Sequence, residues 1–63
     1  MIDFEKDYRS ADWAVRRYVA KNPNCPLHIL ELLSRDEEYY VRRAVTRNPK
    51  CPEAIKVAFI LEN

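Results

Sequence analysis

The sequence predicts an all-α fold built from two copies of a short helical unit, and three observations lead to this prediction. Glycine is absent from the 63 residues, so the residue that most tight β-hairpins need is missing. The pentapeptide Asn-Pro-Asn-Cys-Pro of residues 22–26 recurs as Asn-Pro-Lys-Cys-Pro at residues 48–52. Apolar residues before each pentapeptide follow the spacing of an amphipathic helix. A repeat of 20–50 residues is typical of stacked helical arrays, in which each unit covers its neighbour.

The repeat extends well beyond the pentapeptide. Residues 15–17, Val-Arg-Arg, recur at residues 41–43, and the offset is 26 residues throughout (48 − 22). Trp13 corresponds to Tyr39 at the same offset. We expect one domain over residues 1–63, with an N-terminal extension at residues 1–9, a first unit at 10–35 and a second unit at 36–63.

Each unit is expected to begin with one helix. Ser10 and Asp36 are residue types that favour the N-cap position. The helices should end near Lys21 and Arg47, because the asparagine that follows each of them precedes a proline and is pushed out of the α region. The predicted buried stripe consists of Val15, Tyr18 and Val19 in the first unit and Val41, Ala44 and Val45 in the second.

A second helix should start at each Cys-Pro step, because proline suits the first turn of a helix. In the first unit this helix carries Leu27, Ile29, Leu30, Leu32 and Leu33. In the N-terminal extension, Phe4 and Tyr8 are spaced i, i+4 and are expected to cover the first unit.

The order of acidic residue, aromatic residue, Val-Arg-Arg and Asn-Pro-x-Cys-Pro, followed by a Leu/Ile-rich helix, resembles the leucine-rich repeat variant family over residues 10–63. The resemblance implies units that alternate an α-helix with a 3₁₀-helix in a right-handed superhelical solenoid, and a solenoid of α-helices alone is the alternative. Some members hold an iron–sulfur centre with a cysteine cluster. This chain lacks that cluster, so the resemblance implies no cofactor. The family has no settled activity.

The two cysteines and the single histidine are expected to be structural. Cys25 and Cys51 occupy equivalent positions in stacked units, and packed helices lie about 8–10 Å apart, beyond the span of a disulfide. Cys25, His28 and Cys51 supply three ligands, whereas a closed zinc site needs four. We predict buried free thiols and no metal site.

Basic residues gather on the first helix of each unit. Residues 13–24 carry three basic residues and residues 39–50 four, with no acidic residue in either segment. On an ideal α-helix Trp13, Arg16, Arg17 and Ala20 point away from the predicted apolar stripe. The function predicted is a non-catalytic protein–protein interaction module that presents this basic face to an acidic partner. The predicted partner-binding residues are Trp13, Arg16, Arg17, Lys21, Tyr39, Arg42, Arg43 and Arg47.

Two other interpretations of the basic rows stay open. Asp12 with Arg16 and Glu38 with Arg42 are i, i+4 pairs, so the arginines can serve the helices alone. Evenly spaced cations beside aromatic rings can also follow a nucleic-acid backbone. A net charge of +1 and the lack of a reader motif argue against nucleic acid.

Composition excludes other functions. One histidine and no glycine-rich loop leave no constellation for an enzyme, and two short units offer little room for a small-molecule pocket. No segment reads as a membrane span or a signal peptide, so we expect a cytoplasmic protein.

The last helix is apolar around most of its circumference. An apolar end on a small stack favours self-association, most simply a two-fold homodimer, while tolerated exposure is the alternative. The residues predicted to pair are Val57, Phe59, Ile60 and Leu61.

Overall fold

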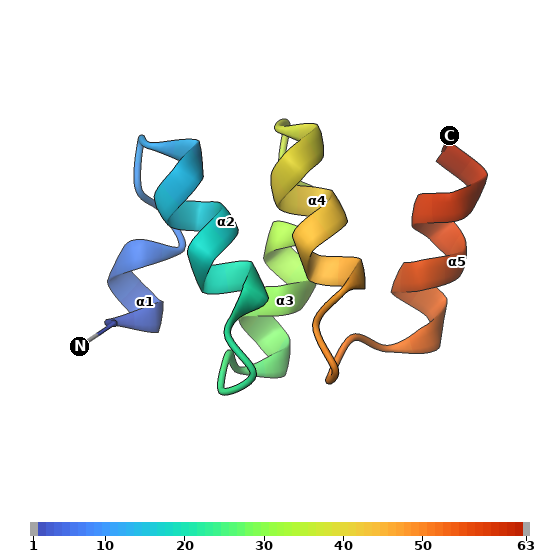
Figure 1. Cartoon of the computed structure of the whole chain (residues 1–63), viewed down its shortest axis with the longest axis horizontal. Coiled ribbons are helices and arrows are strands. Elements are labelled where there is room, and N and C mark those ends of the chain that lie inside the picture. Colours follow the sequence, from blue (N-terminus) through green and yellow to red (C-terminus); the bar gives the residue numbers. More distant parts are fainter. Residues whose placement is uncertain (1, 63) are drawn as a thin grey trace.

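The computed structural model describes residues 2–62, and within this range the chain forms five α-helices and no strand (Figure 1). The all-α prediction is confirmed. The molecule measures 32 × 20 × 14 Å, and its helices follow one another along the longest axis in chain order. The helices are α1 (Phe4–Asp7), α2 (Trp13–Lys21), α3 (Leu27–Leu33), α4 (Tyr39–Thr46) and α5 (Glu53–Glu62).

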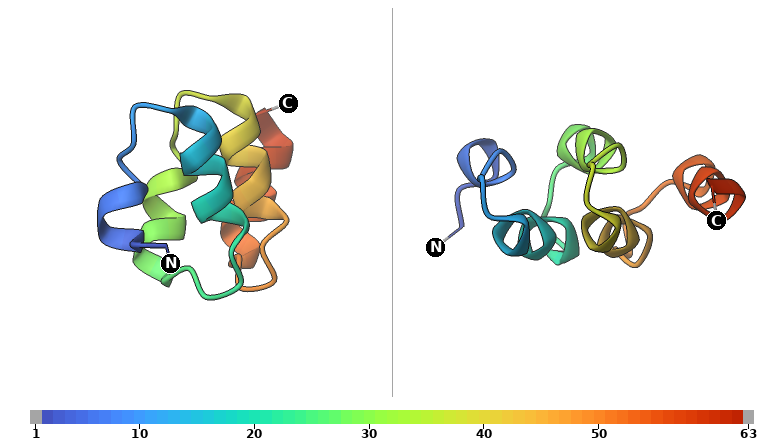
Figure 2. Two further views of the ribbon diagram at one scale, coloured as in Figure 1. Left: turned by 60° about the vertical axis from the view of Figure 1, so that its left-hand side comes forward. Right: turned by 90° about the horizontal axis from the view of Figure 1, so that it is seen from above.

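The helices lie in two rows, which the view from above separates (Figure 2). α2 and α4 lie side by side in one row and make the most extensive contact of any helix pair. α1 and α3 lie in the other row, where α3 packs against both α2 and α4. α5 follows at the far end and packs mainly against α4. Both helices of each unit are α-helical in the described range, so the α/3₁₀ alternative does not describe it.

The helices start two residues later than the sequence predicted. The N-cap residues of α2 and α4 are Asp12 and Glu38. Ser10 Oγ accepts from the backbone N–H of Asp12 at 3.1 Å, and Asp36 Oδ1 accepts from that of Glu38 at 2.9 Å. Ser10 and Asp36 therefore build a turn before the helix, a second use of the side chains that favour N-caps.

The two corners are built alike. Asn22 Oδ1 accepts from the N–H of Asn24 and Asn48 Oδ1 from that of Lys50, both at 2.9 Å. In each corner the cysteine N–H donates to the asparagine carbonyl at 3.0 Å. The helix ends expected near Lys21 and Arg47, and the new helices expected after each Cys-Pro step, are confirmed.

The core lies between the two rows. Its buried residues come from α2, α3, α4 and both corners, and Ile2, Phe4 and Tyr8 of the N-terminal segment pack against it, as predicted for Phe4 and Tyr8. The buried core residues are Val19, Ala20, Cys25, Ile29, Leu30, Leu33, Val41, Ala44, Val45 and Cys51.

The predicted stripe is correct in the second unit and wrong at two positions of the first. Tyr18 is 64% exposed, whereas Ala20, expected to point outward, is fully buried. The equivalent of Tyr18 is Ala44, which is buried and lies on the side of α4 that faces the α2 residues Trp13, Arg17 and Lys21. Position 18 therefore faces away from α4, on the side of α2 where no equivalent helix lies. Ala20 faces α4 instead, so the buried arc of α2 is rotated relative to that of α4.

A buried asparagine joins the two units. Asn48 is 1% exposed, and its Nδ2 donates to the carbonyls of Ala20 and Asn22, both at 2.8 Å. Carbonyls at the end of a helix have no partner within that helix, so a side chain from the next unit satisfies those of α2. Between residues 2 and 62, the side chain of Asn22, at the equivalent position of the first unit, forms a hydrogen bond only within its local turn.

We predict that Asn48→Ala lowers the free energy of unfolding by about 2–3 kcal/mol, because it removes both hydrogen bonds between the units and takes that donor from the Ala20 carbonyl, while the Asn22 carbonyl keeps the N–H of Cys25. Asn22→Ala removes the same local turn but no bond between units, so its loss should stay below about 1 kcal/mol. Urea denaturation followed by far-UV circular dichroism measures both. Equal losses would show that the bonds between the units contribute nothing.

Candidate functional site: a basic groove between two helices

A groove of about 430 Å³ runs along the outer side of the row formed by α2 and α4. Its volume falls within the range of about 300–1,000 Å³ that is usual for ligand sites, which is more room than the sequence led us to expect. Basic and aromatic side chains line most of it, and no acidic residue does. The lining residues are Trp13, Arg17, Lys21, Tyr40, Arg43, Ala44 and Arg47.

The four cations of the groove, Arg17, Lys21, Arg43 and Arg47, have no ion pair or side-chain hydrogen bond to any residue between 2 and 62. Arg17 corresponds to Arg43 and Lys21 to Arg47 at the 26-residue offset. Because α2 and α4 lie side by side in register, the two cations of each equivalent pair face each other across the groove. We call each such pair, Arg17 with Arg43 and Lys21 with Arg47, a rung. The groove thus concentrates four positive charges in a chain whose net charge is only +1.

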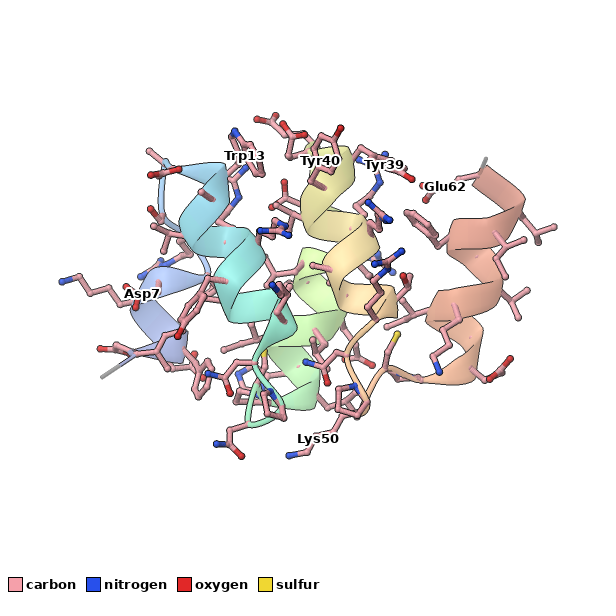
Figure 3. All side chains as sticks on the ribbon, in the orientation of Figure 1. Asp7, Trp13, Tyr39, Tyr40, Lys50 and Glu62 are labelled. Carbon is pink, nitrogen blue, oxygen red and sulfur yellow. The ribbon has the colours of Figure 1, made fainter. Side chains whose placement is uncertain are left out.

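Two aromatic rings close one end of the groove. Trp13 and Tyr40 stack with ring centroids 5.8 Å apart and planes inclined by 27° (Figure 3). Sequence reasoning named Trp13 but missed Tyr40, because at the 26-residue offset Tyr40 corresponds to Ala14. Helix geometry could have revealed Tyr40. It lies one residue beyond Tyr39, the equivalent of Trp13, and one residue rotates a side chain by about 100° around the helix, here toward α2.

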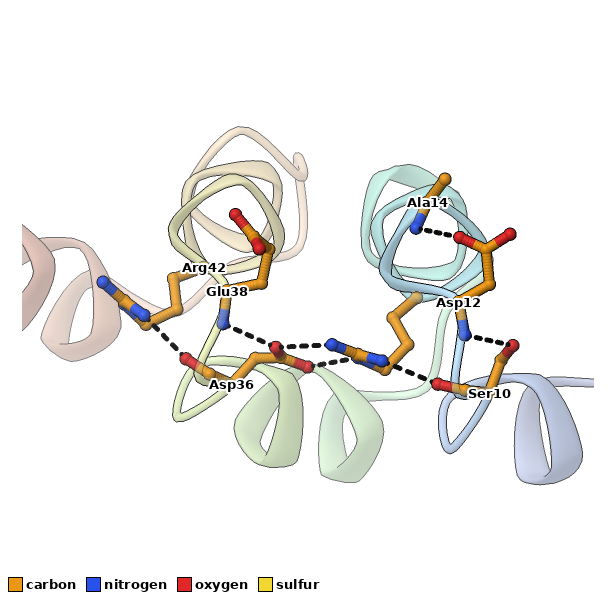
Figure 4. A network of polar contacts seen from close by, with 7 residues as sticks. Ser10, Asp12, Ala14, Asp36, Glu38 and Arg42 are labelled. Atoms are coloured by element: carbon orange, nitrogen blue, oxygen red, sulfur yellow. Dashed lines mark hydrogen bonds and ion pairs between the residues drawn. The ribbon is translucent and has the colours of Figure 1, made fainter.

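Arg16 and Arg42, both predicted to bind a partner, form hydrogen bonds within the chain, and Figure 4 shows the contact of Arg42 with Asp36. Arg16 donates from Nε and Nη2 to the two carboxylate oxygens of Asp36, at 2.7 and 3.2 Å, and from Nη1 to the carbonyl of Ser10 at 2.7 Å. Its hydrogen bond to Asp36 raises the pKa of the Arg16 guanidinium above its ordinary value. The expected i, i+4 pair of Arg16 with Asp12 is wrong; Asp12 caps α2.

Arg42 repeats this arrangement one unit later. Its Nη1 donates to the carbonyl of Asp36 at 2.7 Å, and its Nε forms an ion pair with Glu62 Oε1 at 3.3 Å without hydrogen-bond geometry. The expected pair of Arg42 with Glu38 is therefore wrong as well. Tyr39 also lies off the groove: its ring packs 5.7 Å from that of Phe59 and joins α4 to α5.

The two cysteines lie in the core, and the histidine contacts a neighbouring helix. Cys25 and Cys51 are free thiols in the core, as predicted. Burial raises the pKa of Cys25 to about 11 and also raises that of Cys51, so both stay protonated at neutral pH. His28 Nε2 lies 2.8 Å from Glu5 Oε2, linking α3 to α1. No cluster of three or more potential ligands occurs between residues 2 and 62.

The far end of the molecule presents apolar side chains. Val57, Ile60 and Leu61 of α5 are 45%, 70% and 79% exposed, whereas Phe59 is half-buried against Tyr39. Of the four residues predicted to pair two chains, three therefore point outward and Phe59 contacts α4. Among residues 2–62, no helix has the length and apolarity that crossing a bilayer requires.

The family model for the leucine rich repeat variant matches residues 13–38. Residues 13–38 are therefore similar to one unit of that family. The match supports the resemblance over these residues, which include the first Asn-Pro-x-Cys-Pro corner. The match spans α2, α3 and the loop to α4, and its 26 residues (13 to 38 inclusive) equal the offset of the repeat. No curated protein and no solved structure gave a significant match to the chain.

Within residues 13–38, Arg16 binds Asp36 whereas the adjacent Arg17 lines the groove. Arg16→Gln should lower the free energy of unfolding by about 2–3 kcal/mol, because it leaves the nearly buried Asp36 carboxylate without its bidentate partner. Arg17→Gln should change it by less than about 0.5 kcal/mol, because Arg17 lines an open groove. The two variants carry the same change of side chain and charge. Equal urea midpoints for the two variants would contradict a structural role for Arg16 that Arg17 does not share.

Proposed function

We propose that the chain is a non-catalytic protein–protein interaction module whose groove between α2 and α4 binds an acidic segment of a partner protein. One observation carries the proposal: Arg17, Lys21, Arg43 and Arg47 line one groove without any acidic neighbour in its wall. Paired cations serve the fold, as Arg16 does with Asp36. Four cations side by side repel one another, so an anionic ligand is what would complement them.

The aromatic end of the groove supports a ligand that is more than a counterion. Trp13 and Tyr40 are 42% and 50% exposed, although aromatic rings are usually covered when they serve a core. Exposed aromatic side chains beside arginines are the residue types that dominate protein–protein hot spots. An acidic partner with an apolar side chain would use both ends of the groove.

Single-stranded nucleic acid is the second candidate. The observation that favours it is the same aromatic pair, since bases stack on exposed rings while cations neutralise phosphates. The small number of cations and the net charge of +1 favour the protein partner, because nucleic-acid-binding domains are usually strongly basic.

The proposal also covers the stacking of the two units, their place in one domain and the location of the protein in the cell. The units at residues 10–35 and 36–63 stack as a right-handed superhelical solenoid within one domain, as the leucine rich repeat variant family implies. The repeated contacts of Arg16 and Arg42, one unit apart, support such stacking. A cytoplasmic location stays a prediction from the sequence.

The proposal also includes a homodimer through α5, supported by a comparison of the two units. Residues 31, 34 and 35 of the first unit, at the end of α3 and in the turn after it, are Glu, Ser and Arg, whereas the equivalent positions of the second unit are Val57, Ile60 and Leu61 of α5. Packing within the unit does not require apolar residues there, because the first unit has polar residues at all three positions. A second copy that pairs the same face across a two-fold axis would bury this surface.

Reversing the charge of two cations in the groove should strongly weaken its binding of an acidic peptide. Arg17→Glu with Arg43→Glu is expected to weaken binding of fluorescein-labelled decaglutamate at least about tenfold in low salt, because one complete rung changes sign. Lys6→Glu with Lys50→Glu carries the same change in net charge outside the groove and should weaken binding less than about twofold. Fluorescence anisotropy measures binding, and circular dichroism confirms that all variants stay helical.

Equal weakening by both double variants would contradict a groove-specific site. Ten-nucleotide single-stranded and double-stranded DNA are titrated in parallel. Tighter binding of either oligonucleotide than of decaglutamate would favour the nucleic-acid alternative.

The dimer has its own test. We expect light scattering to give the mass of two chains at micromolar concentration. Val57→Glu, Ile60→Ser and Leu61→Arg, which install the residues that the first unit has at the equivalent positions, should return the mass to one chain and keep the helical signal. A single-chain mass for the unmodified protein would exclude the dimer.

A further inference from the structure

The groove has a direction, with aromatic rings at one end and cations along the rest. Trp13 is the first residue of α2 and Tyr40 the second of α4, so both lie at the N-terminal ends of their helices. Lys21 ends α2 and Arg47 follows the last residue of α4. Arg17 and Arg43 form the rung between them. A ligand therefore meets a stacking surface first, then one pair of cations, then a second pair.

The spacing of these levels follows from helix geometry. Trp13, Arg17 and Lys21 are separated by four residues each along α2. An α-helix rises 1.5 Å per residue, so successive levels are about 6 Å apart and the whole groove is about 12 Å long. In an extended peptide, side chains on one face recur every second residue, about 6.6 Å apart. The spacing of the levels in the groove therefore matches the spacing of side chains on one face of an extended peptide.

A helical ligand fits less well. A helix with its side chains is about 10–12 Å in diameter, so a 12 Å length of it fills roughly 1,000 Å³. The groove measures about 430 Å³. A single extended segment that presents one row of side chains between α2 and α4 suits that volume better.

The aromatic end departs from the repeat itself. Tyr40 stands where the first unit has Ala14, while Tyr39, the true equivalent of Trp13, packs against Phe59. The internal contacts of α4 therefore use Tyr39, and Tyr40 adds a second exposed ring against Trp13. Two rings at this level provide a surface for one large apolar side chain of the ligand.

We propose that the groove binds an extended acidic peptide in which an aromatic anchor is followed, at every second residue, by two acidic side chains. The anchor contacts Trp13 and Tyr40. The first acid lies between Arg17 and Arg43, and the second between Lys21 and Arg47. This inference rests on the proposed function, since it names the chemistry and spacing of the acidic partner.

The test compares three fluorescein-labelled heptapeptides by anisotropy in low salt. The first reads serine, tryptophan, serine, glutamate, serine, glutamate, serine. The second has the same composition with the two glutamates adjacent, so that in an extended chain they point to opposite faces. The third replaces the tryptophan of the first with serine. We expect the first to bind at least about fivefold more tightly than either control, because only it uses all three levels.

The variant Tyr40→Ala installs the residue that the first unit has at the equivalent position, so it should fold. It is expected to reduce the advantage of the first peptide over the third to less than about twofold, while binding of the third stays unchanged. An unchanged advantage would overturn the role of the aromatic end.

The outcomes separate the inference from the function on which it rests. If all three peptides bind with one affinity, the groove recognises negative charge alone: the spacing and the anchor are wrong, and the acidic partner stands. If none of the three peptides nor decaglutamate binds, the proposed function itself fails. If the peptide with adjacent glutamates binds best, an extended ligand in this register is excluded.

Discussion

The side-chain amide of Asn48 holds the two units of this chain in register. Its two hydrogen bonds to carbonyls of Ala20 and Asn22 fix the C-terminal end of α2 against the corner after α4. The bidentate contact of Arg16 with Asp36 does the same at the other end. Burial of valine and alanine between the helices drives association but is non-directional, so the sliding of α2 along α4 is limited by these polar contacts.

The register of α2 relative to α4 determines which side chains are neighbours in the groove. With α2 and α4 held level, cations 26 residues apart become neighbours across one groove, whereas a slip of one residue would rotate each of them by about 100°. The stabilising contacts and the groove lie on different sides of the same helices. Arg16 and Arg17 are adjacent in sequence, yet one reaches back to the turn before α4 and the other lines the open surface.

Local signals in the sequence were enough to predict the helix ends, both corners, the buried cysteines and the buried stripe of α4. The errors arose where the deciding contact is distant. Asp12 is four residues from Arg16 and Asp36 is twenty, so periodicity favours the wrong partner. Tyr18 and Ala44 share a position in the repeat but not an environment, because only the latter has a helix beside it. Tyr40 was missed because comparison of the units pairs it with alanine.

The positions at which the two units differ therefore hold information that their agreement does not. Equivalent positions share the same local geometry, so packing within a unit favours similar residues at both. At position 40 and along the outer side of α5, the second unit instead carries large apolar side chains that remain exposed. Exposed apolar surface is costly in water and gains nothing for the unit that bears it, as the alanine, glutamate, serine and arginine of the first unit demonstrate. We therefore propose that these residues make contacts beyond the unit, at the aromatic end of the groove and at the far end of the molecule.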